Sequence, residues 1–331
     1  MRIGLIGLGR IGAFHADTLS SLDSVKELLV TDPVAAAAES VAARTGATVV
    51  GSAEELLAAG VDGVVVASST PTHLPLTEAA VRAGIPVFCE KPAAQDPRDA
   101  APLLSLAEST NVPVQVGFPR RFDPAFRAAK AEADSGVLGR LTTVRSTTMD
   151  PAPPPAAYIA ASGGIFRDCA VHDLDAVRWL VGRPVVEVYA AGTAEGDGFI
   201  RDAGDVDTAS ALLTFEGGTI GLVSCTRRNG RGYDVRLEVH GEQDSVAAGL
   251  DEGLPMRSAD PAVQFPAGPP HSFFMDRFPD AFRAELQAFA EVVAGSPSPC
   301  TLREGLEASW IAEACALSLA EHRPVRLAEL R

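Results

Sequence analysis

The sequence has little lysine, few aromatic residues and no paired cysteines. Of its 331 residues only three are lysine (Lys26, Lys91 and Lys130), and aromatic residues make up 6%. The five cysteines are dispersed and contain no Cys-x-x-Cys pair. We therefore expect reduced thiols in a cytoplasmic protein, not a disulfide framework. We also expect no metal site, since histidine and cysteine do not recur at ligand spacing.

Basic charge and long apolar runs are scarce too. Lysine and arginine total 28 against 43 aspartate and glutamate, which gives a net charge of −15. Phosphate backbones and anionic lipids repel such a chain, so nucleic acid and membrane surfaces are poor partners. No apolar run approaches the ~18 residues of a membrane span. With 47% hydrophobic residues the chain is an ordinary globular protein, long enough for roughly two domains.

The first 120 residues alternate short apolar runs with amphipathic segments. The apolar runs are Ile3–Ile6, Leu28–Thr31, Val61–Ala67, Ile85–Cys89 and Val112–Gly117. The amphipathic segments between them are Ile11–Leu22, Ala35–Thr45, Thr72–Ala83 and Asp99–Ser109. Strands separated by helices of this length form right-handed crossovers and a parallel sheet. We predict an α/β fold in which residues 1–120 form a Rossmann domain with a doubly wound parallel sheet.

Residues 121–331 have a different pattern, in which strands with one buried face recur. The strand-like segments are Ala211–Phe215, Thr219–Cys225 and Tyr233–His240, with a hairpin turn predicted at Glu216–Gly218. Helical patterns return in Asp280–Ala294 and Leu302–Glu321, and the proline-rich Asp150–Pro155 is predicted to be a loop. These features predict a C-terminal α+β domain with a largely antiparallel open sheet.

A glycine motif, Gly7-Leu8-Gly9-Arg10-Ile11-Gly12, joins the first apolar run to the first helical segment. In a dinucleotide-binding turn, Gly7 would permit the tight bend, Gly9 the approach of a pyrophosphate, and Gly12 close packing. The N–H groups at the helix start, around Arg10 and Ile11, would face the phosphates. A plain tight turn is the alternative.

Asp32 stands twenty residues after Gly12, at the end of the second apolar run. A carboxylate at this place accepts hydrogen bonds from the adenine ribose and repels a 2′-phosphate, which favours NAD over NADP. The alternative is a turn-forming aspartate before Pro33.

Two further segments carry candidate chemistry. Glu90 and Lys91 end a predicted strand, at the sheet edge where ligands bind. If the chain is helical from Asp168, then Asp168, His172 and Asp175 share one face. A solvated polar stripe with an ordinary surface histidine is the alternative. The other histidines, His15, His240, His271 and His322, have no evident partners in the sequence and are expected to be structural or exposed.

Together these segments resemble the glucose–fructose oxidoreductase/inositol dehydrogenase/rhizopine-catabolism (Gfo/Idh/MocA) family over essentially the whole chain. Besides the glycine motif, the resemblance is carried by Ser69–His73, Glu90-Lys91-Pro92, Val114–Asp123, Gly163–Asp175 and Trp179-Leu180. Within the family, the inositol dehydrogenases are most similar. Pro119, where those enzymes usually carry methionine, and the Pro151–Pro155 loop depart from their pattern, which affects the choice of polyol.

The resemblance implies NAD-dependent oxidation of a secondary hydroxyl of a cyclic polyol, first of all myo-inositol to 2-keto-myo-inositol. Another sugar or inositol isomer is the nearest alternative, and a non-catalytic dinucleotide sensor is an alternative from a different class. The implied general base is His172, with Asp168 orienting it and Lys91 donating to the reacting oxygen.

Binding roles follow from the same resemblance. Arg120 and Asp175 are expected to hold other substrate hydroxyls, although Arg120 could instead make a structural ion pair. Thr70, Pro71 and His73 are expected to line the cofactor, with Glu90 and Lys91 beside the nicotinamide and Lys91-Pro92 as a cis peptide. Family members also imply a homo-oligomer, dimer or tetramer, paired through the sheet face that carries Arg236, Glu238 and His240.

Overall fold

The chain folds into two compact units. The computed structural model describes residues 1–263 and 268–331. Unit 1 comprises Met1–Phe122 and Asp280–Leu306, and unit 2 comprises Asp123–Pro279 and Glu307–Arg331. Residues 280–306 thus pack with unit 1, whereas from the sequence we counted them with residues 121–331.

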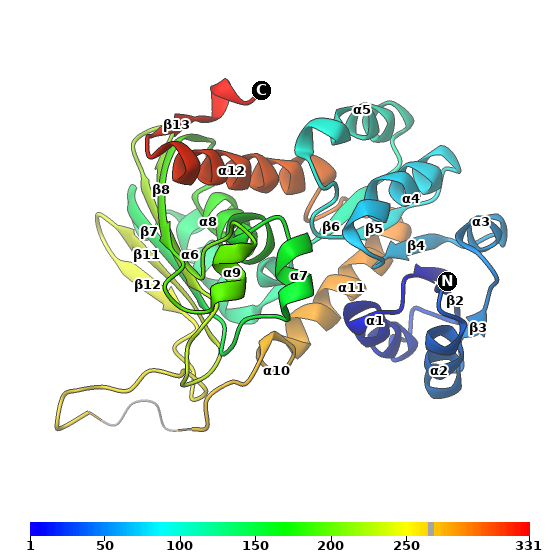
Figure 1. Cartoon of the computed structure of the whole chain (residues 1–331). Helices are drawn as coiled ribbons and strands as arrows, with labels where there is room; N and C mark the ends of the chain where they lie inside the picture. The colour runs from blue at the N-terminus through cyan, green and yellow to red at the C-terminus, as the bar shows by residue number, and fades with distance from the viewer. Residues whose placement is uncertain (264–267) are drawn as a thin grey trace. The chain divides into compact units, whose positions relative to one another are not determined.

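Unit 1 is built on a parallel sheet with the strand order β3-β2-β1-β4-β5-β6 (Figure 1). Its strands are β1 (Arg2–Ile6), β2 (Glu27–Thr31), β3 (Thr48–Val49), β4 (Gly63–Val66), β5 (Val87–Glu90) and β6 (Val114–Gly117). All neighbouring strands are parallel, so the predicted Rossmann sheet is confirmed. β4, β5 and β6 are buried along their whole length, which is why most of their residues are apolar. The order reverses between β1 and β4, the kind of point at which ligands bind.

The helices of unit 1 include those predicted from the amphipathic segments. They are α1 (Arg10–Ser20), α2 (Ala35–Thr45), α3 (Ala53–Ala58), α4 (Thr70–Arg82), α5 (Ala101–Thr110) and α11 (Pro279–Val293), with short 3₁₀ turns at Pro97–Ala100 and Pro119–Phe122. The long helix α12 (Leu302–Glu321) begins in this unit.

Helix α11 belongs to unit 1 because its apolar face completes the core of that unit. Leu286, Phe289 and Val292 lie in one buried cluster with residues of α1, α2 and the sheet. Gly63 of β4 leaves room for the helix, since a Cβ there would lie 2.6 Å from Val293 Cγ2. The amphipathic pattern of α11 predicts a buried face but does not say which sheet covers it.

Unit 2 contains a mixed sheet with the order β12-β11-β7-β10-β9-β8-β13. Its strands are β7 (Leu141–Met149), β8 (Val185–Thr193), β9 (Thr208–Phe215), β10 (Ile220–Thr226), β11 (Asp234–Gly241), β12 (Ser245–Ala248) and β13 (Val325–Arg326). The β7–β10 pair is parallel and the other pairs are antiparallel, so the predicted open sheet is confirmed. β9 and β10 form the predicted hairpin.

Helices cover one face of this sheet and leave the other exposed (Figure 1). The helical segments are α6 (Pro124–Ser135), α7 (Ala156–Ala161), a π-helical turn (Phe166–Ala170), α8 (Val171–Val181), α9 (Gly198–Asp202), α10 (Phe274–Arg277), the rest of α12 and a last 3₁₀ turn (Leu327–Glu329). Alternate residues of β9 and β10 are buried, as one-sided burial requires. The exposed residues of this unit include Tyr189, Leu212, Ile220 and Leu222. No helix within residues 1–263 and 268–331 is long and apolar enough to span a membrane.

Candidate active site

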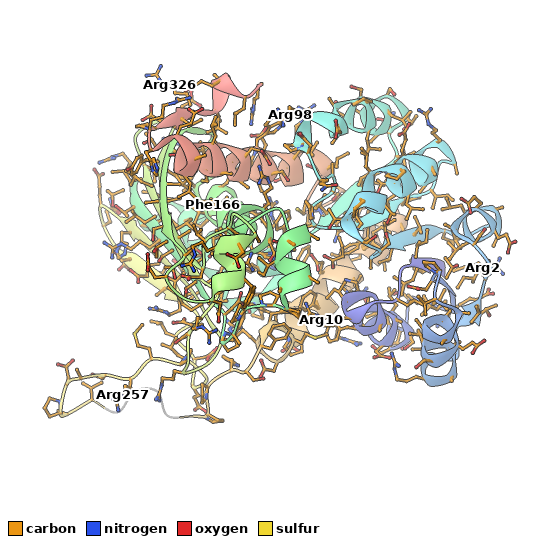
Figure 2. All side chains as sticks on the ribbon, in the orientation of Figure 1. Arg2, Arg10, Arg98, Phe166, Arg257 and Arg326 are labelled. Carbon is orange, nitrogen blue, oxygen red and sulfur yellow. The ribbon has the colours of Figure 1, made fainter. Side chains whose placement is uncertain are left out.

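The glycine motif forms the turn between β1 and α1. Gly7 has φ +91°, and a Cβ there would lie 2.4 Å from the backbone of Ser68. A Cβ at Gly12 would lie 2.0 Å from the carbonyl oxygen of Gly7, whereas one at Gly9 would meet open space. Gly9 precedes the first residue of α1, Arg10 (Figure 2), and the first turn of that helix carries no acidic residue. The two tight glycines bring strand and helix together, and the third leaves space at the helix start for an anionic group.

Asp32 lies beside this turn and uses both carboxylate oxygens. Oδ2 accepts a hydrogen bond from the backbone N–H of Leu8 at 2.7 Å, and Oδ1 accepts one from Val34 N at 2.8 Å. The second bond is the aspartate turn that we considered as the alternative to cofactor binding. Each oxygen keeps a further lone pair, so the turn fixes the carboxylate without excluding acceptance from a ribose hydroxyl.

The remaining predicted cofactor residues follow β4 and β5. Thr70 and Pro71 open α4, and Pro71 is exposed. The Lys91-Pro92 peptide is cis, as the resemblance implies. Since β1, β2, β4 and β5 are parallel neighbours, their carboxyl ends bring all these residues to one edge of the sheet.

The carboxylate of Glu90 is held inside unit 1. Its Oε1 lies 2.6 Å from Nε2 of the buried His15, and its Oε2 accepts from the backbone N–H of Lys91 at 3.2 Å. Burial alone would raise the pKa of Glu90, but the hydrogen bond from His15, together with Lys91 and His73, holds it below its ordinary value. Glu90 is therefore a carboxylate whose oxygens bind protein groups, and this favours a positioning role over a direct cofactor contact.

His73 is also engaged within unit 1. Its Nδ1 lies 2.8 Å from the carbonyl oxygen of Pro92, and its Nε2 lies 3.0 Å from that of Ser68. Two carbonyl acceptors require both ring nitrogens to carry protons. Burial by itself lowers the pKa of His73, but Cys89 and the two carbonyl groups outweigh this effect and raise the pKa to about 9. The ring thus links the turn before α4 to the residue after Lys91, and both its polar atoms are used there instead of on a cofactor.

Arg120 and Arg121 are both buried in the 3₁₀ turn that follows β6. Arg121 forms a structural ion pair with Glu304 at 2.9 Å. Arg121 also donates to the carbonyl oxygen of Pro299 at 3.3 Å. The substrate contact assigned to Arg120 stays a prediction.

In unit 2 the predicted helix of Asp168 and His172 begins with a different geometry. Asp168 lies in the π-helical turn, and regular α-helix starts only at Val171. The segment from Asp168 onward is thus helical, as we considered, but its first turn is a π turn and not an α turn. A π turn adds one residue to the hydrogen-bonded ring, and such turns occur frequently at functional sites. His172 follows on the first turn of α8 and is half-buried, whereas Asp175 is fully buried.

Asp173 fixes α8 against the sheet. Its Oδ1 accepts from the hydroxyls of Ser146 at 2.6 Å and Thr148 at 2.9 Å, and its Oδ2 accepts from Thr148 at 2.8 Å. Leu174 and Val177 are buried on the same helix. These contacts set the rotation of α8 about its axis and hence the direction of His172.

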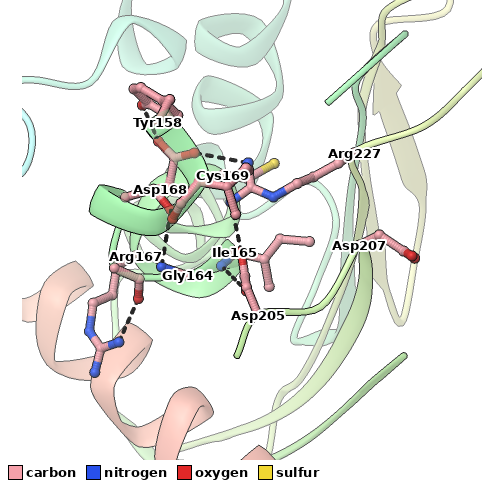
Figure 3. Close-up of polar contacts among 12 residues, drawn as sticks. Tyr158, Gly164, Ile165, Arg167, Asp168, Cys169, Asp205, Asp207 and Arg227 are labelled. Carbon is pink, nitrogen blue, oxygen red and sulfur yellow. Dashed lines mark hydrogen bonds and ion pairs between the residues drawn. The ribbon is translucent and has the colours of Figure 1, made fainter. Parts of the chain in front are cut away.

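Asp168 is the centre of a polar network shown in Figure 3. Its Oδ1 accepts from the hydroxyl of Tyr158 at 2.7 Å, and its Oδ2 accepts from the guanidinium of Arg227 at 3.0 Å. Arg227 is 1% exposed and also pairs with Asp205 at 3.3 Å. Burial lowers the pKa of Arg227, and Asp168 and the other nearby groups raise it above its ordinary value, so the guanidinium stays charged. Asp205 in turn accepts from the backbone N–H of Ile165 at 2.9 Å.

Sequence reasoning missed His15 and the Arg227 network. His15 shares the buried face of α1 with Gly12, Ala16 and Leu19, and this spacing marks it as an inward histidine. Arg227 follows β10 directly, but 59 positions separate it from Asp168, and no local pattern connects the two. The structure therefore groups the predicted residues into two sets, one at the sheet edge of unit 1 and one on the π turn and α8 of unit 2.

The sequence matches two family profiles that together span most of the chain. Residues 1–118 match the profile described as oxidoreductase family, NAD-binding Rossmann fold, and residues 126–247 match the GFO/IDH/MocA C-terminal domain. The chain belongs to the Gfo/Idh/MocA family. Its N-terminal unit is thus an NAD-binding Rossmann domain of an oxidoreductase family, as the sequence predicts.

Full-length relatives of this Gfo/Idh/MocA member include several inositol dehydrogenases. Inositol 2-dehydrogenase of Rhizobium meliloti (strain 1021) is 38% identical over 329 residues, which covers 99% of each chain. The crystal structure of a myo-inositol dehydrogenase from Corynebacterium glutamicum superposes with a TM-score of 0.89 at 35% identity, covering 99% of this chain and 98% of that one. Scyllo-inositol dehydrogenase of Lactobacillus casei, solved with NAD(H) and scyllo-inositol, gives 0.88 at 29% identity over 99% of each chain.

The residues present fit the dinucleotide that the family binds. Open space at Gly9, the uncapped start of α1 and the fixed carboxylate of Asp32 supply a place for phosphates and an acceptor for ribose hydroxyls. Within the described part of the chain, no group of three or more His, Cys, Asp or Glu side chains is arranged to hold a metal ion.

Proposed function

We propose that this protein oxidises one secondary hydroxyl of a cyclic polyol, with myo-inositol and its 2-keto product as the first pair to test. The observation that carries the proposal is the full-length similarity to inositol dehydrogenases in a chain that retains Lys91, Asp168 and His172. A bound NAD would accept the hydride from the substrate carbon. The roles of this chain's own residues follow from the groups that surround them.

His172 takes the hydroxyl proton in this proposal. A neutral imidazole is suited to that task near pH 7. Asp168 precedes it by four residues and carries a negative charge that favours the imidazolium as it forms. Arg227 and Tyr158 hold that carboxylate in one orientation through two hydrogen bonds. Asp173 helps to fix the position of His172, because its hydrogen bonds to β7 anchor α8.

Lys91 donates to the reacting oxygen, on which negative charge develops as the hydroxyl proton leaves. It follows β5 directly, and its backbone N–H is bound by Glu90. Arg120 and Asp175 hold other ring hydroxyls of the substrate. A polyol needs several such partners, because each buried hydroxyl left unpaired costs about 1–3 kcal/mol.

A substrate panel tests the proposal directly. Purified protein is mixed with NAD and, separately, with each inositol isomer, several aldoses and an open-chain sugar acid, while absorbance is followed at the NADH band. We expect reduction of NAD with at least one inositol. Activity on an open-chain sugar acid alone would contradict the substrate class, and NADH binding without any turnover would favour a dinucleotide sensor.

An inositol isomer other than myo-inositol is the second candidate. Pro119 stands where the inositol dehydrogenases usually carry methionine, and it begins the turn that bears Arg120. A rigid proline removes a flexible side chain from this turn and alters the space beside the hydroxyl-binding groups. We expect Pro119→Met to change the ratio of kcat/KM between isomers and to leave NADH binding unchanged.

The open face of the unit 2 sheet supports a homo-oligomer, dimer or tetramer, as a further part of the proposal. Tyr189, Leu212, Ile220 and Leu222 are 43%, 42%, 43% and 37% exposed, an unusual set of apolar side chains on sheet strands facing solvent. A second copy would cover such a face by the same residues. Light scattering at micromolar concentration tests this, and a monomer would contradict it. We also propose that the protein works in a reducing cytoplasm, and the five buried free thiols support this.

A further inference from the structure

A buried histidine of α1 lies against the acidic residue that precedes Lys91. His15 is 0% exposed, and its Nε2 lies 2.6 Å from Glu90 Oε1. Its Nδ1 is buried without a hydrogen-bond partner. A neutral imidazole carries one N–H, so a proton on Nε2 accounts for both observations. A protonated ring would instead bury an unpaired N–H, which is costly. His15 is therefore a neutral donor to Glu90.

Aromatic rings and a glycine pack closely around the His15–Glu90 pair. The ring centroid of His15 lies 5.6 Å from that of Phe88, 5.9 Å from Phe282 and 6.3 Å from Phe14. Gly117 of β6 backs the carboxylate, because a Cβ there would lie 3.2 Å from Glu90 Cδ. Close packing on both sides fixes the imidazole and the carboxylate relative to each other.

The same carboxylate connects His15 to the candidate lysine. While Oε1 accepts from His15, Oε2 accepts from the backbone N–H of Lys91 at 3.2 Å. The titratable groups that act on Glu90 are His15 on α1, Lys91 after β5, and His73 on α4. Glu90 therefore places a negative charge beside Lys91, and the N–H of His15 compensates part of the cost of burying that charge.

We propose that His15 is a positioning residue that, through Glu90, ties the helix starting at the dinucleotide turn to Lys91 and keeps a carboxylate beside that lysine. The inference deepens the proposed function, because that function assigns Lys91 to the reacting oxygen. Without the His15 N–H, the buried carboxylate loses its shortest hydrogen bond and takes up a proton more readily. Lys91 then loses a neighbouring anion that stabilises its ammonium form.

Two substitutions separate the hydrogen bond from the packing of the ring. His15→Phe keeps an aromatic ring among Phe14, Phe88 and Phe282 but removes the donor. His15→Gln keeps an N–H at a similar reach and should preserve the bond to Glu90. Glu90→Gln removes the negative charge without disturbing the aromatic cluster, and it keeps the test available if His15→Phe fails to fold.

The scarcity of lysine provides a direct readout. With only Lys26, Lys91 and Lys130 in the chain, lysine-selective isotope labelling gives three side-chain signals, and Lys91→Arg assigns one of them. We expect the titration midpoint of Lys91 to fall in His15→Phe and in Glu90→Gln, as for a lysine that loses an adjacent anion. His15→Gln should stay near the wild-type midpoint. Lys26 and Lys130 serve as internal controls.

Kinetics supply the second readout. His15→Phe should lower kcat about tenfold, move any high-pH decline in rate to lower pH, and change NADH affinity by less than about twofold. His15→Gln should recover most of kcat. A Lys91 midpoint in both His15→Phe and Glu90→Gln equal to that of the wild type would show that His15 is merely structural. Wild-type protein that binds NADH but oxidises no polyol would contradict the proposed function instead, and the lysine titration would still decide the role of His15.

Discussion

The two units hold a buried carboxylate in opposite ways. Glu90 of unit 1 precedes Lys91, Asp168 of unit 2 precedes His172 by one turn, and their side chains are 11% and 13% exposed. Glu90 is bound by a neutral imidazole donor and by a backbone N–H. Asp168 is bound by a guanidinium and a phenol. Burying a carboxylate is unfavourable unless donors or charges compensate it, and the two units meet this requirement with different chemistry.

The difference predicts how each site responds to its surroundings. Arg227 keeps its charge at all accessible pH values, so its bond to Asp168 does not depend on protonation. Because Arg227 also pairs with Asp205, one cation faces two carboxylates and the network keeps a net negative charge. In unit 1 the donors are neutral or titratable, so the charge on Glu90 depends on the state of its neighbours. In the proposed mechanism the cation beside Asp168 therefore keeps its charge as pH changes, whereas the groups around Glu90 do not.

The largest effect should come from the proposed base of unit 2. His172→Ala should lower turnover by about 10²–10⁴-fold, the usual contribution of a positioned acid–base group. NADH affinity, measured by fluorescence titration, should stay near the wild-type value because the dinucleotide turn lies in unit 1. His322→Asn, at an exposed position, is the matched control. Near-normal turnover of His172→Ala would move the proton-transfer role to Lys91.

Removing the guanidinium of Arg227 should destabilise the polar network around Asp168 in unit 2. Arg227→Met leaves Asp168 and Asp205 buried together without their shared guanidinium, and such a loss typically costs about 3–5 kcal/mol of unfolding free energy. Urea denaturation measures the change. The deficit should shrink as pH falls, since protonation relieves the stranded carboxylates.

Arg228→Met supplies the control for that substitution. The side chain of Arg228 is 54% exposed and pairs with Asp197 at the surface, where ion pairs contribute little to stability. We expect a change below about 1 kcal/mol. Equal losses in the two variants would contradict the importance of the buried network.

In unit 1, the pH dependence of stability can be measured by substituting His73. Its pKa is raised from 6.5 to about 9 in the folded protein. A raised histidine pKa contributes stability that is fully present below pH 6.5 and is lost as pH rises through 9. The shift corresponds to about 3 kcal/mol. The stability of wild type relative to His73→Gln should therefore decline between pH 6.5 and 9, and a difference independent of pH would contradict a charged His73.

The smallest effect concerns Asp32, whose carboxylate accepts hydrogen bonds within its own turn and, in the proposed function, from the cofactor. Wild type should prefer NAD over NADP by at least about tenfold in kcat/KM, because Asp32 repels a 2′-phosphate. Asp32→Ser should narrow this preference, mainly by weakening use of NAD. It should also loosen the turn, since Asp32 accepts from the N–H groups of Leu8 and Val34. Equal efficiency of wild type with both dinucleotides would refute the assignment.

Sequence reasoning was most successful where local pattern and structure coincide. The segment Ile3–Ile6 and its counterparts are apolar because both faces of a parallel strand are buried, and they match β1, β2, β4, β5 and β6 closely. The short elements β3 and α3 were not predicted, because two and six residues are too few to show a period. The π turn at Phe166–Ala170 was missed as well, since a change of hydrogen-bond register leaves the apolar spacing almost unaltered.

By itself, the sequence determined the parallel α/β fold of the first unit, its dinucleotide turn, one antiparallel hairpin of the second unit and the family resemblance. These features depend on neighbouring residues, whose spacing is visible in the chain. Only the tertiary structure decided that α11 completes the core of unit 1, that His15 binds Glu90 across 75 positions, and that Arg227 binds Asp168 across 59. The physical reason is that a buried charge requires a partner, but the partner can come from any element that packs beside it.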